Sequence, residues 1–222
     1  LVVTGDKDLD LDFGATDADD TTTTLYFGTS SASATDGLGV TEIDASAMTG
    51  KLNINTTDVA LSTSEALIVK TGSGNDTITL ASKSTVDAGA GDDTITTVSG
   101  QSSTLTGGAG KDTFVVTATV AASTTAPKIT TIKDFTSGDT ITMGDVNAVS
   151  LKAIGVANVA TATSLVDAIT KALGGGATGI TAIANNTAVY FNYGADTYIV
   201  VNDTTAGFNT SDIIVKLTGT VE

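Results

Sequence analysis

The chain has 222 residues, 25 of them acidic and 10 basic, and its formal net charge is −15. It contains no cysteine, histidine, tryptophan or arginine. Without thiol and imidazole side chains, this segment has no zinc site of the common kind, no thiol nucleophile and no serine–histidine hydrolysis. A chain this acidic is also unsuited to nucleic acid and to anionic membrane surfaces, because both are bound by clustered cations.

The acidity comes almost wholly from aspartate, with 22 aspartates and three glutamates. The short aspartate side chain suits tight turns, where it bonds locally. Carboxylates are natural ligands of hard cations, and Ca²⁺ takes about six to eight oxygen ligands. A general role of the acid in solubility is the alternative. The lack of cysteine allows an extracellular protein that is stapled by something other than disulfides.

The organisation of the chain indicates an all-β fold in three parts. Short β-branched runs recur between clusters of glycine, aspartate, asparagine and serine, and proline occurs once. We predict a strand-rich, solenoid-like segment over 1–70, a repeat over 71–116 and a closing β-rich cap over 117–222. The sequence begins at Leu1 and not at methionine, so we expect a fragment or a processed chain. No apolar run reaches the ~18 residues of a membrane-spanning helix.

The first part holds six predicted strands. They are LVVTG at 1–5, LDLDF at 9–13, TLYFG at 24–28, VTEIDAS at 40–46, KLNIN at 51–55 and ALIVK at 66–70. In the second strand and its flanks, aspartates alternate with apolar residues, so that one face is acidic. These residues are Asp8, Asp10 and Asp12, which alternate with Leu9, Leu11 and Phe13. A solvated strand face is one interpretation and a calcium-lining face is the other.

The second part repeats one motif three times. It reads GSGNDTITL at 72–80, GAGDDTITT at 89–97 and GAGKDTFVV at 108–116. The copies begin 17 and then 19 residues apart, which is typical of stacked units. Between them lie the weaker runs 84–88 and 103–107, so one coil is predicted as turn, strand, plain turn, strand. The plain turns at 81–83 and 98–102 lack the glycine–aspartate pattern.

The glycine turns have the chemistry of a cation site. Glycine permits positive φ, so backbone oxygens can turn inward at ligand distance. Each turn ends in an aspartate, namely Asp76, Asp93 or Asp112. After it, Ile78, Ile95 and Phe114 are predicted to point inward and the threonines outward. Strands stacked about 4.8 Å apart bring the turns together, so three turns give two between-turn sites on one edge. A metal-free glycine–threonine solenoid with solvated aspartates is the alternative.

The third part contains two strands in 129–143 around a Ser-Gly-Asp turn, and one helix near 164–173. Ser164 and Asp167 form a capping box, and glycines at 174–176 end the helix. Its apolar stripe is assigned to core contact, with a partner-binding surface as the alternative; it comprises Leu165, Ala168, Ile169, Ala172 and Leu173. A β-hairpin follows around Gly194-Ala195-Asp196, and 211–219 supplies a last strand.

The three turns resemble the calcium-binding nonapeptide GGxGxDxUx of the RTX (repeats-in-toxin) proteins. Thr71 and Ala88 depart from it, since they stand where the motif begins with glycine. The run TIKDFTSGDTITM at 131–143 looks like the strand pair that follows the repeats in type I secreted proteins. The segments 40–54, 190–203 and 212–222 resemble those of RTX surface-layer (S-layer) proteins of Gram-negative bacteria.

This resemblance implies a fold, a set of ligands and a function. The fold is a right-handed parallel β-roll or β-helix with calcium-binding turns, and a C-terminal β-rich cap with one short helix. The function is that of an S-layer subunit, which calcium folds after type I secretion and which self-assembles into a two-dimensional lattice. No enzyme activity is expected. The implied partners are calcium, other copies of the chain, the secretion apparatus and cell-surface polysaccharide. The candidate calcium residues are Asp76, Asp93, Asp112, Gly72, Ser73, Gly74, Asn75, Gly89, Ala90, Gly91, Asp92, Gly108 and Gly110, with Asp134 and Asp139 as weaker candidates that could simply hold a turn.

Two other classes of function are compatible with the same turns. One is the C-terminal calcium-binding module of an RTX adhesin, which would add a recognition domain or longer repeat arrays. The other is the tail of a secreted enzyme, whose catalytic domain would lie upstream of Leu1. Self-assembly into sheets discriminates the S-layer subunit from both. A catalytic role for the neighbouring carboxylates Asp92 and Asp93 is not favoured, because they lie in turns suited to metal.

Overall fold

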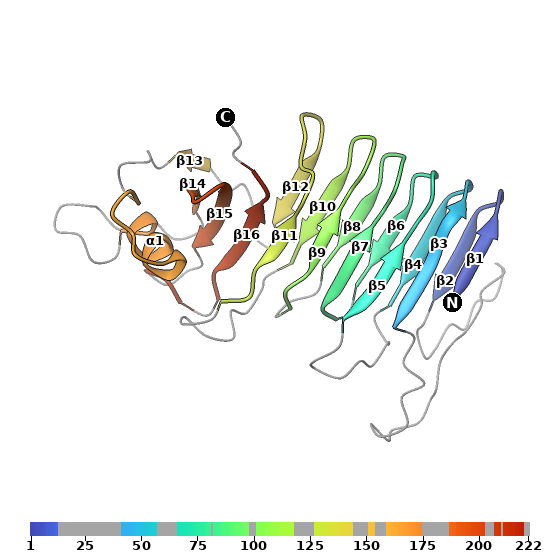
Figure 1. Ribbon diagram of the computed structural model, residues 1–222, viewed down its shortest axis with the longest axis horizontal. Helices are drawn as coiled ribbons and strands as arrows, with labels where there is room; N and C mark the ends of the chain where they lie inside the picture. The colour runs from blue at the N-terminus through green and yellow to red at the C-terminus, as the bar shows by residue number, and fades with distance from the viewer. Residues whose placement is uncertain are drawn as a thin grey trace, which may run out of the picture. The chain divides into compact units, whose positions relative to one another are not determined.

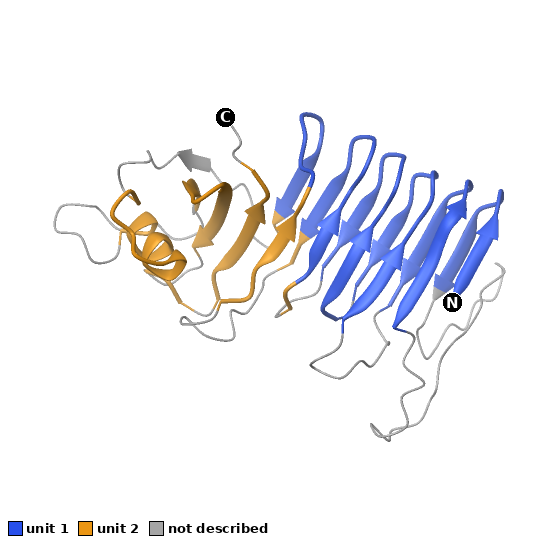
Figure 2. Ribbon diagram, viewed as in Figure 1, with its two compact units in different colours: residues 1–98, 103–115, 134–142 blue, residues 99–102, 116–133, 143–222 orange. Residues whose placement is uncertain are grey.

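A computed structural model describes most of the chain, and its described residues fall into two compact units (Figure 2). The described residues are 1–12, 41–56, 66–80, 82–97, 101–117, 127–143, 151–153, 159–174, 187–202, 207–209 and 211–219. The first unit comprises residues 1–98, 103–115 and 134–142, and the second comprises residues 99–102, 116–133 and 143–222. The predicted strand at 24–28 lies outside the described residues.

The first unit is built from two sets of strands between which the chain alternates (Figure 1). One set runs in the order β1 (Val2–Gly5), β3 (Glu42–Met48), β5 (Leu67–Lys70), β7 (Ser84–Asp87), β9 (Thr104–Thr106). The other runs in the order β2 (Leu9–Asp12), β4 (Leu52–Asn55), β6 (Thr77–Thr79), β8 (Thr94–Thr96), β10 (Thr113–Val116), β12 (Thr140–Met143). The pairs from β1 to β9 and from β2 to β10 are parallel. The prediction of a strand-rich fold with parallel sheets is confirmed.

Strict register gives this unit its core. Ile54, Ile78, Ile95 and Phe114 lie opposite one another on neighbouring strands, and all four are buried. The set from β1 to β9 aligns Ile43, Val69, Val86 and Leu105 in the same way. The threonines on either side of the buried isoleucines are half-exposed, as the alternation of a strand requires. The predicted inward and outward residues of the repeat are therefore confirmed.

The second unit combines one mixed set of strands with a helix. Its strands lie in the order β11 (Thr130–Ile132), β16 (Ile213–Leu217), β15 (Asp196–Asn202), β14 (Thr187–Tyr193), β13 (Leu151–Ala153). Strand β15 is antiparallel to both β14 and β16, whereas the β11–β16 and β13–β14 pairs are parallel. Tyr193 pairs with Asp196 across the turn, and Gly194 in that turn has a φ of 66°. The predicted hairpin is thus confirmed.

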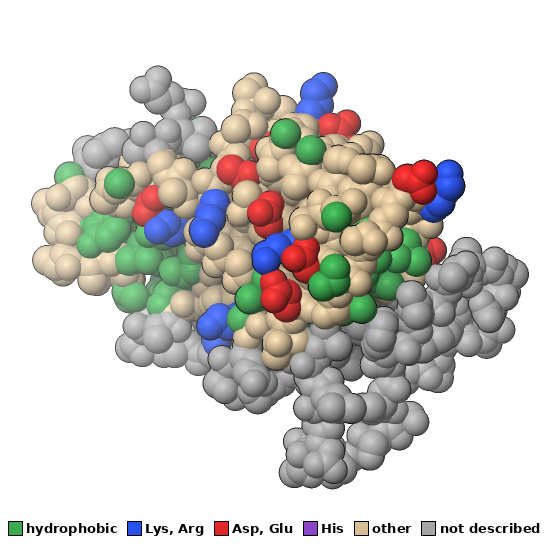
Figure 3. All heavy atoms as spheres, turned by 45° about the vertical axis from the view of Figure 1, so that its right-hand side comes forward, with side chains coloured by type: hydrophobic (Ala, Val, Ile, Leu, Met, Phe, Trp, Pro, Cys, Tyr) green, Lys and Arg blue, Asp and Glu red, His purple; other side chains and the backbone are tan. Residues whose placement is uncertain are grey.

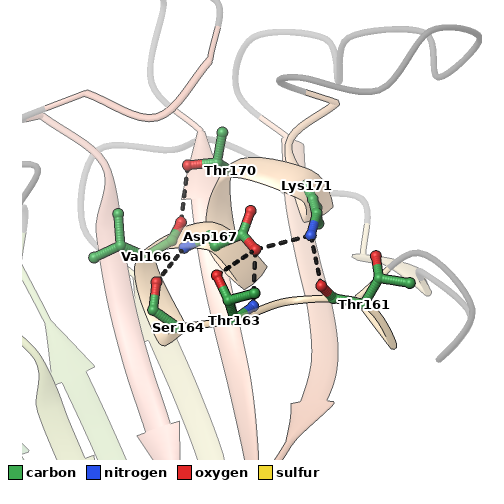
Figure 4. Close-up of polar contacts among 7 residues, drawn as sticks. All are labelled: Thr161, Thr163, Ser164, Val166, Asp167, Thr170 and Lys171. Carbon is green, nitrogen blue, oxygen red and sulfur yellow. Dashed lines mark hydrogen bonds and ion pairs between the residues drawn. The ribbon is translucent and has the colours of Figure 1, made fainter.

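Helix α1 (Leu165–Ala172) forms where the sequence predicts it (Figure 4). The Ser164 hydroxyl accepts a hydrogen bond from the Asp167 amide at 3.1 Å, and the Asp167 carboxylate accepts one from the Thr163 amide at 2.8 Å. Lys171 forms an ion pair with Asp167 at 2.8 Å, one turn along the helix.

Among the described residues, no helix is long and apolar enough to cross a membrane.

The apolar face of α1 packs on the β14–β15–β16 strands, which confirms its assignment to the core. Ala168, Ile169 and Ala172 are buried in a cluster with side chains from these strands. Within the cluster the rings of Phe191 and Tyr198 stack with their centroids 5.8 Å apart. The hydrophobic effect therefore holds this unit together, as in ordinary globular domains.

Candidate metal centre

The three glycine turns stack directly on one another along one edge of the first unit. The Ala90 amide donates to the Gly72 carbonyl at 2.9 Å, and the Ala109 amide donates to the Gly89 carbonyl at 2.9 Å. A Cβ added at Gly89 would overlap with the Gly72 carbonyl oxygen, and one added at Gly108 would overlap with that of Gly89. Backbone therefore lies against backbone at these positions, which only glycine permits.

The backbone conformation of the turns agrees with the sequence-based expectation in two copies out of three. Gly89 and Gly91 have φ of 91° and 123°, and Gly108 and Gly110 have φ of 101° and 146°. The first turn differs, because neither of its glycines has a positive φ. Close approach requires glycine there instead, since a Cβ at Gly72 would overlap with the Met48 carbonyl and one at Gly74 with Gly50.

The aspartates that end the turns form a continuous ladder. Each uses Oδ1 to accept the amide of the equivalent residue in the coil before it. The Leu52 amide donates to Asp76 at 2.7 Å, and the Asp76 amide donates to Asp93 at 2.7 Å. The Asp93 amide donates to Asp112, and the Asp112 amide donates to Asp139, both at 3.0 Å. One oxygen of each carboxylate is thus committed to the backbone.

The second carboxylate oxygens are the unusual feature. Asp76 and Asp93 are each 1% exposed, and Asp112 is 2% exposed. Oδ2 of Asp76 and Oδ2 of Asp93 are buried and accept no hydrogen bond. Burying a carboxylate oxygen without a partner costs free energy, so such an atom points to a ligand.

The electrostatics of the ladder agree with this. Burial, together with the neighbouring carboxylates Asp76 and Asp112, raises the pKa of Asp93 to about 7. Burial also raises the pKa of Asp76 and of Asp112. A cation placed among these groups would stabilise their ionised forms.

A second row of side chains runs beside the ladder and points the opposite way along the stack. Oδ1 of Asn75 accepts the Asp92 amide at 3.0 Å, and Oδ1 of Asp92 accepts the Lys111 amide at 2.8 Å. Each interval between glycine turns is therefore clamped from both sides, once by this row and once by the aspartate ladder. The side chain of Lys111 has no oxygen that could accept an amide of the next coil, so this row ends at the third turn.

Backbone carbonyls would have to complete any metal site here. Among the described residues, no three acidic side chains lie close enough together to hold a metal ion by themselves. Ca²⁺ accepts backbone carbonyl oxygens alongside carboxylates, and the glycine turns are rich in them. The donor set therefore fits a hard, oxygen-binding cation and not one that needs nitrogen or sulfur ligands.

The remaining candidates of the sequence analysis lie in the same turns. The Ser73 amide donates a hydrogen bond of 3.0 Å to the Met48 carbonyl in the preceding coil. Ala90 pairs with Ala109, and the Gly91 amide donates to the Ala109 carbonyl at 2.8 Å. A Cβ at Gly110 would overlap with the Gly91 carbonyl. The fold thus brings together the glycine, serine, alanine and asparagine candidates along one edge.

Asp134 and Asp139 lie in the next turn of the stack, and their oxygens accept backbone amides. The Asp134 carboxylate accepts the amides of Gly107 and Gly108 at 3.0 and 2.7 Å. Asp139 accepts the Asp112 amide with Oδ1 and the Thr136 amide, at 2.7 Å, with Oδ2. Both residues hold backbone amides of the stacked turns, which is the alternative to calcium binding that the sequence left open for them.

Two turns that the sequence analysis missed extend the same edge upstream. The Thr49 amide donates to Gly5 at 2.9 Å, and the Lys51 amide donates to Oδ1 of Asp8 at 2.9 Å. Leu9 and Leu52 pair with each other and occupy the ladder position of the aspartates. The signals in the sequence were Gly50, two residues before Leu52, and Asp8, directly before Leu9; both turns lack the terminal aspartate.

Exposed acidic residues behave differently from the buried ladder. In the space-filling view, carboxylates lie interspersed with lysines on one face (Figure 3). Glu42 pairs with Lys70 at 2.7 Å on that kind of surface, and a hydrogen bond from Ser46 lowers the pKa of Asp44. Solubility explains such residues. It does not explain carboxylates that are 1% exposed.

Comparison with protein-family models finds none that matches this chain, and comparison with curated proteins finds no similar one.

Proposed function

We propose that this chain is part of a calcium-dependent RTX-type S-layer protein of a Gram-negative bacterium. In this proposal it folds after type I secretion and assembles into a two-dimensional lattice on the cell surface. The observation that carries the calcium site is the pair of buried, unpartnered Oδ2 atoms of Asp76 and Asp93, which end two of the stacked glycine turns. The lattice and the secretion route rest on the resemblance of the repeats and of the C-terminal segments.

Two calcium sites are proposed, one in each interval between the three glycine turns. The carboxylates of Asp76, Asp93 and Asp112 would hold the ions together with backbone carbonyls of the turns. Bound calcium would supply electrostatic cohesion between coils. The alternation between two parallel sets of strands supports a β-roll, and a right-handed path is the one that such crossovers take.

The chain's own residues explain why folding would depend on the cation. Neighbouring carboxylates raise the pKa of Asp93 and of Asp112, so a metal-free fold at neutral pH holds mutually repelling charges. Glycine-rich turns also lose much backbone entropy on folding. A cation that binds only the folded state shifts this balance toward folding by mass action. Low calcium inside the cell and millimolar calcium outside would then delay folding until after export.

A calcium titration of the chelator-treated protein tests the proposal. Circular dichroism follows β-structure at each calcium concentration, and negative-stain electron microscopy follows assembly. The proposal expects a gain of β-structure at millimolar calcium and ordered sheets. A variant with Asp93→Asn should need more calcium, whereas Asp87→Asn, on the exposed face of β7, should behave as wild type.

Other results would contradict parts of the proposal. A gain of structure without sheets would overturn the lattice and favour the module of an adhesin or of a secreted enzyme. No response to calcium would overturn the metal sites themselves. Cell-surface polysaccharide, the partner implied for anchoring, is tested separately by cosedimentation of assembled sheets with purified polysaccharide.

A further inference from the structure

The two intervals between the glycine turns differ at the residue that precedes each turn. This position holds Thr71 in the first turn, Ala88 in the second and Gly107 in the third. Thr71 is 3% exposed, and its hydroxyl donates a hydrogen bond of 2.7 Å to the Ala88 carbonyl oxygen in the next coil. It therefore links the first turn to the second. The methyl group of Ala88 cannot do the same toward Gly107.

The first interval is consequently bridged by three side-chain hydrogen bonds. They are Thr71 Oγ1 to the Ala88 carbonyl at 2.7 Å, the Asp92 amide to Asn75 Oδ1 at 3.0 Å, and the Asp76 amide to Asp93 Oδ1 at 2.7 Å. The bridges lie at the beginning and at the end of the turn. They fix the distance between the two turns along its whole length.

The second interval has two such bridges. The Lys111 amide donates to Asp92 Oδ1 at 2.8 Å, and the Asp93 amide donates to Asp112 Oδ1 at 3.0 Å. Both lie at the end of the turn. At its beginning, the Asp112 carboxylate fills the space that a Cβ at Gly107 would need. At the beginning of this interval, the two turns are therefore linked only by hydrogen bonds between backbone groups.

We propose that Thr71 is a positioning residue that makes the cation site between turns 72–76 and 89–93 the tighter of the two. This inference rests on the proposed calcium binding of the turns. A site assembled from two turns binds more tightly when their spacing is fixed before the ion arrives, because less ordering remains to be done on binding. One buried side-chain hydrogen bond corresponds to about a fivefold change in an equilibrium constant.

Thr71 stands directly before the turn that Asp76 ends. Its hydroxyl donates to the Ala88 carbonyl, and Oδ2 of Asp76 is buried and accepts no hydrogen bond. Thr71 thus fixes the turn spacing and leaves the carboxylate oxygen free for a cation.

Calorimetric titration with calcium and excitation spectra of bound Eu³⁺ test the inference, because Eu³⁺ resolves sites of different geometry. Wild type should show two sites of unequal affinity. Thr71→Val should weaken the tighter site about fivefold and shift one europium band, and Thr71→Ser should restore both. Ala88→Thr should tighten the weaker site by supplying the missing bridge. Thr77→Val, at a half-exposed position on β6, is the matched control and should change neither site.

The outcomes separate this inference from the proposed function. Circular dichroism at saturating calcium first confirms that each variant is folded. Two sites that are unaffected by Thr71→Val would overturn the positioning role while calcium binding stands. A loss that Thr71→Ser does not reverse would also overturn it, because packing and not the hydroxyl would then be responsible. No binding of calcium or Eu³⁺ to wild type would overturn the proposed sites.

Discussion

The two units of the chain obtain their stability in different ways. The first also has an apolar core, but along one edge its glycine turns stack backbone on backbone, and buried aspartates supply the side-chain contacts there. In the second, an amphipathic helix covers a sheet with aliphatic and aromatic side chains. The stabilisation from an apolar core does not depend on pH or on cations, whereas that from a row of buried carboxylates depends on both. We therefore expect the two units to respond oppositely to the same changes in conditions.

The largest expected effect is the loss of a core ring in the second unit. Phe191→Ala removes a buried ring that stacks on Tyr198, and we expect it to lower the free energy of unfolding of this unit by about 3–5 kcal/mol. Hydrogen exchange with mass spectrometry reads the two units separately. The loss in the second unit should be the same in calcium and in chelator. A loss confined to chelator would contradict the comparison.

Glycine substitutions give the next effect, and each unit offers a matched position. In Gly89→Ala, the alanine must adopt a φ of 91° and its Cβ overlaps with the Gly72 carbonyl. We therefore expect the free energy of unfolding to fall by about 2–4 kcal/mol. In Gly194→Ala, in the β14–β15 turn, the alanine must adopt a φ of 66°, but its Cβ has open space around it. A loss of about 1 kcal/mol in the free energy of unfolding is therefore expected. Urea unfolding of both variants in calcium measures the difference. Equal losses would show that turn stacking adds nothing.

The pH dependence should have opposite signs in the two units. Asp93 has its pKa raised to about 7, so the unfolded chain releases this proton more readily than the fold does. The stability of the metal-free first unit should therefore fall as pH rises from about 4 to 7. In the second unit, bonds from Lys216 and Lys171 lower the pKa of Asp196 and Asp167. That contribution is present above about pH 4 and is lost as pH falls further.

Hydrogen exchange in chelator between pH 4 and pH 8, corrected for the intrinsic rate, measures this pH dependence. Protection of 72–80 and 89–97 should decrease with pH, while protection of β15 and β16 should not. Added calcium should remove the decrease, since the cation stabilises the ionised carboxylates. Parallel behaviour of both units would mean that the buried row does not control the first unit.

Asp93→Asn sharpens the same contrast, with an expected size of roughly 1–3 kcal/mol. The side-chain carbonyl can still accept the Asp76 amide, but the buried charge is gone. In chelator at pH 8 the first unit should become more stable than wild type. In calcium it should become less stable, because a ligand of the proposed sites is lost. In urea titrations, the variant should thus be more stable than wild type in chelator and less stable in calcium. A change in the same direction under both conditions would contradict a metal role.

The sequence predicted the local elements of the two units unequally well. Helix α1 and the hairpin were found because capping residues, periodicity and turn residues act locally. The glycine turns were found because they repeat. The upstream turns before Leu9 and Leu52 were missed, since stacking onto the next coil and not their own residues puts them on the same edge. The bridge from Thr71 to Ala88 joins residues 17 apart, and no pattern within one turn reveals it.

The smallest effect probes a local interaction that should be independent of the first unit. Ser164 accepts the Asp167 amide at the start of α1, and Ser164→Ala removes this cap (Figure 4). We expect a loss of about 1 kcal/mol in the second unit. The effect should be the same with and without calcium, and Ser164→Asp should recover most of it, since aspartate caps a helix equally well. Protection of α1 amides against hydrogen exchange measures it. A calcium-dependent loss at this helix would mean that the cation acts on the second unit as well.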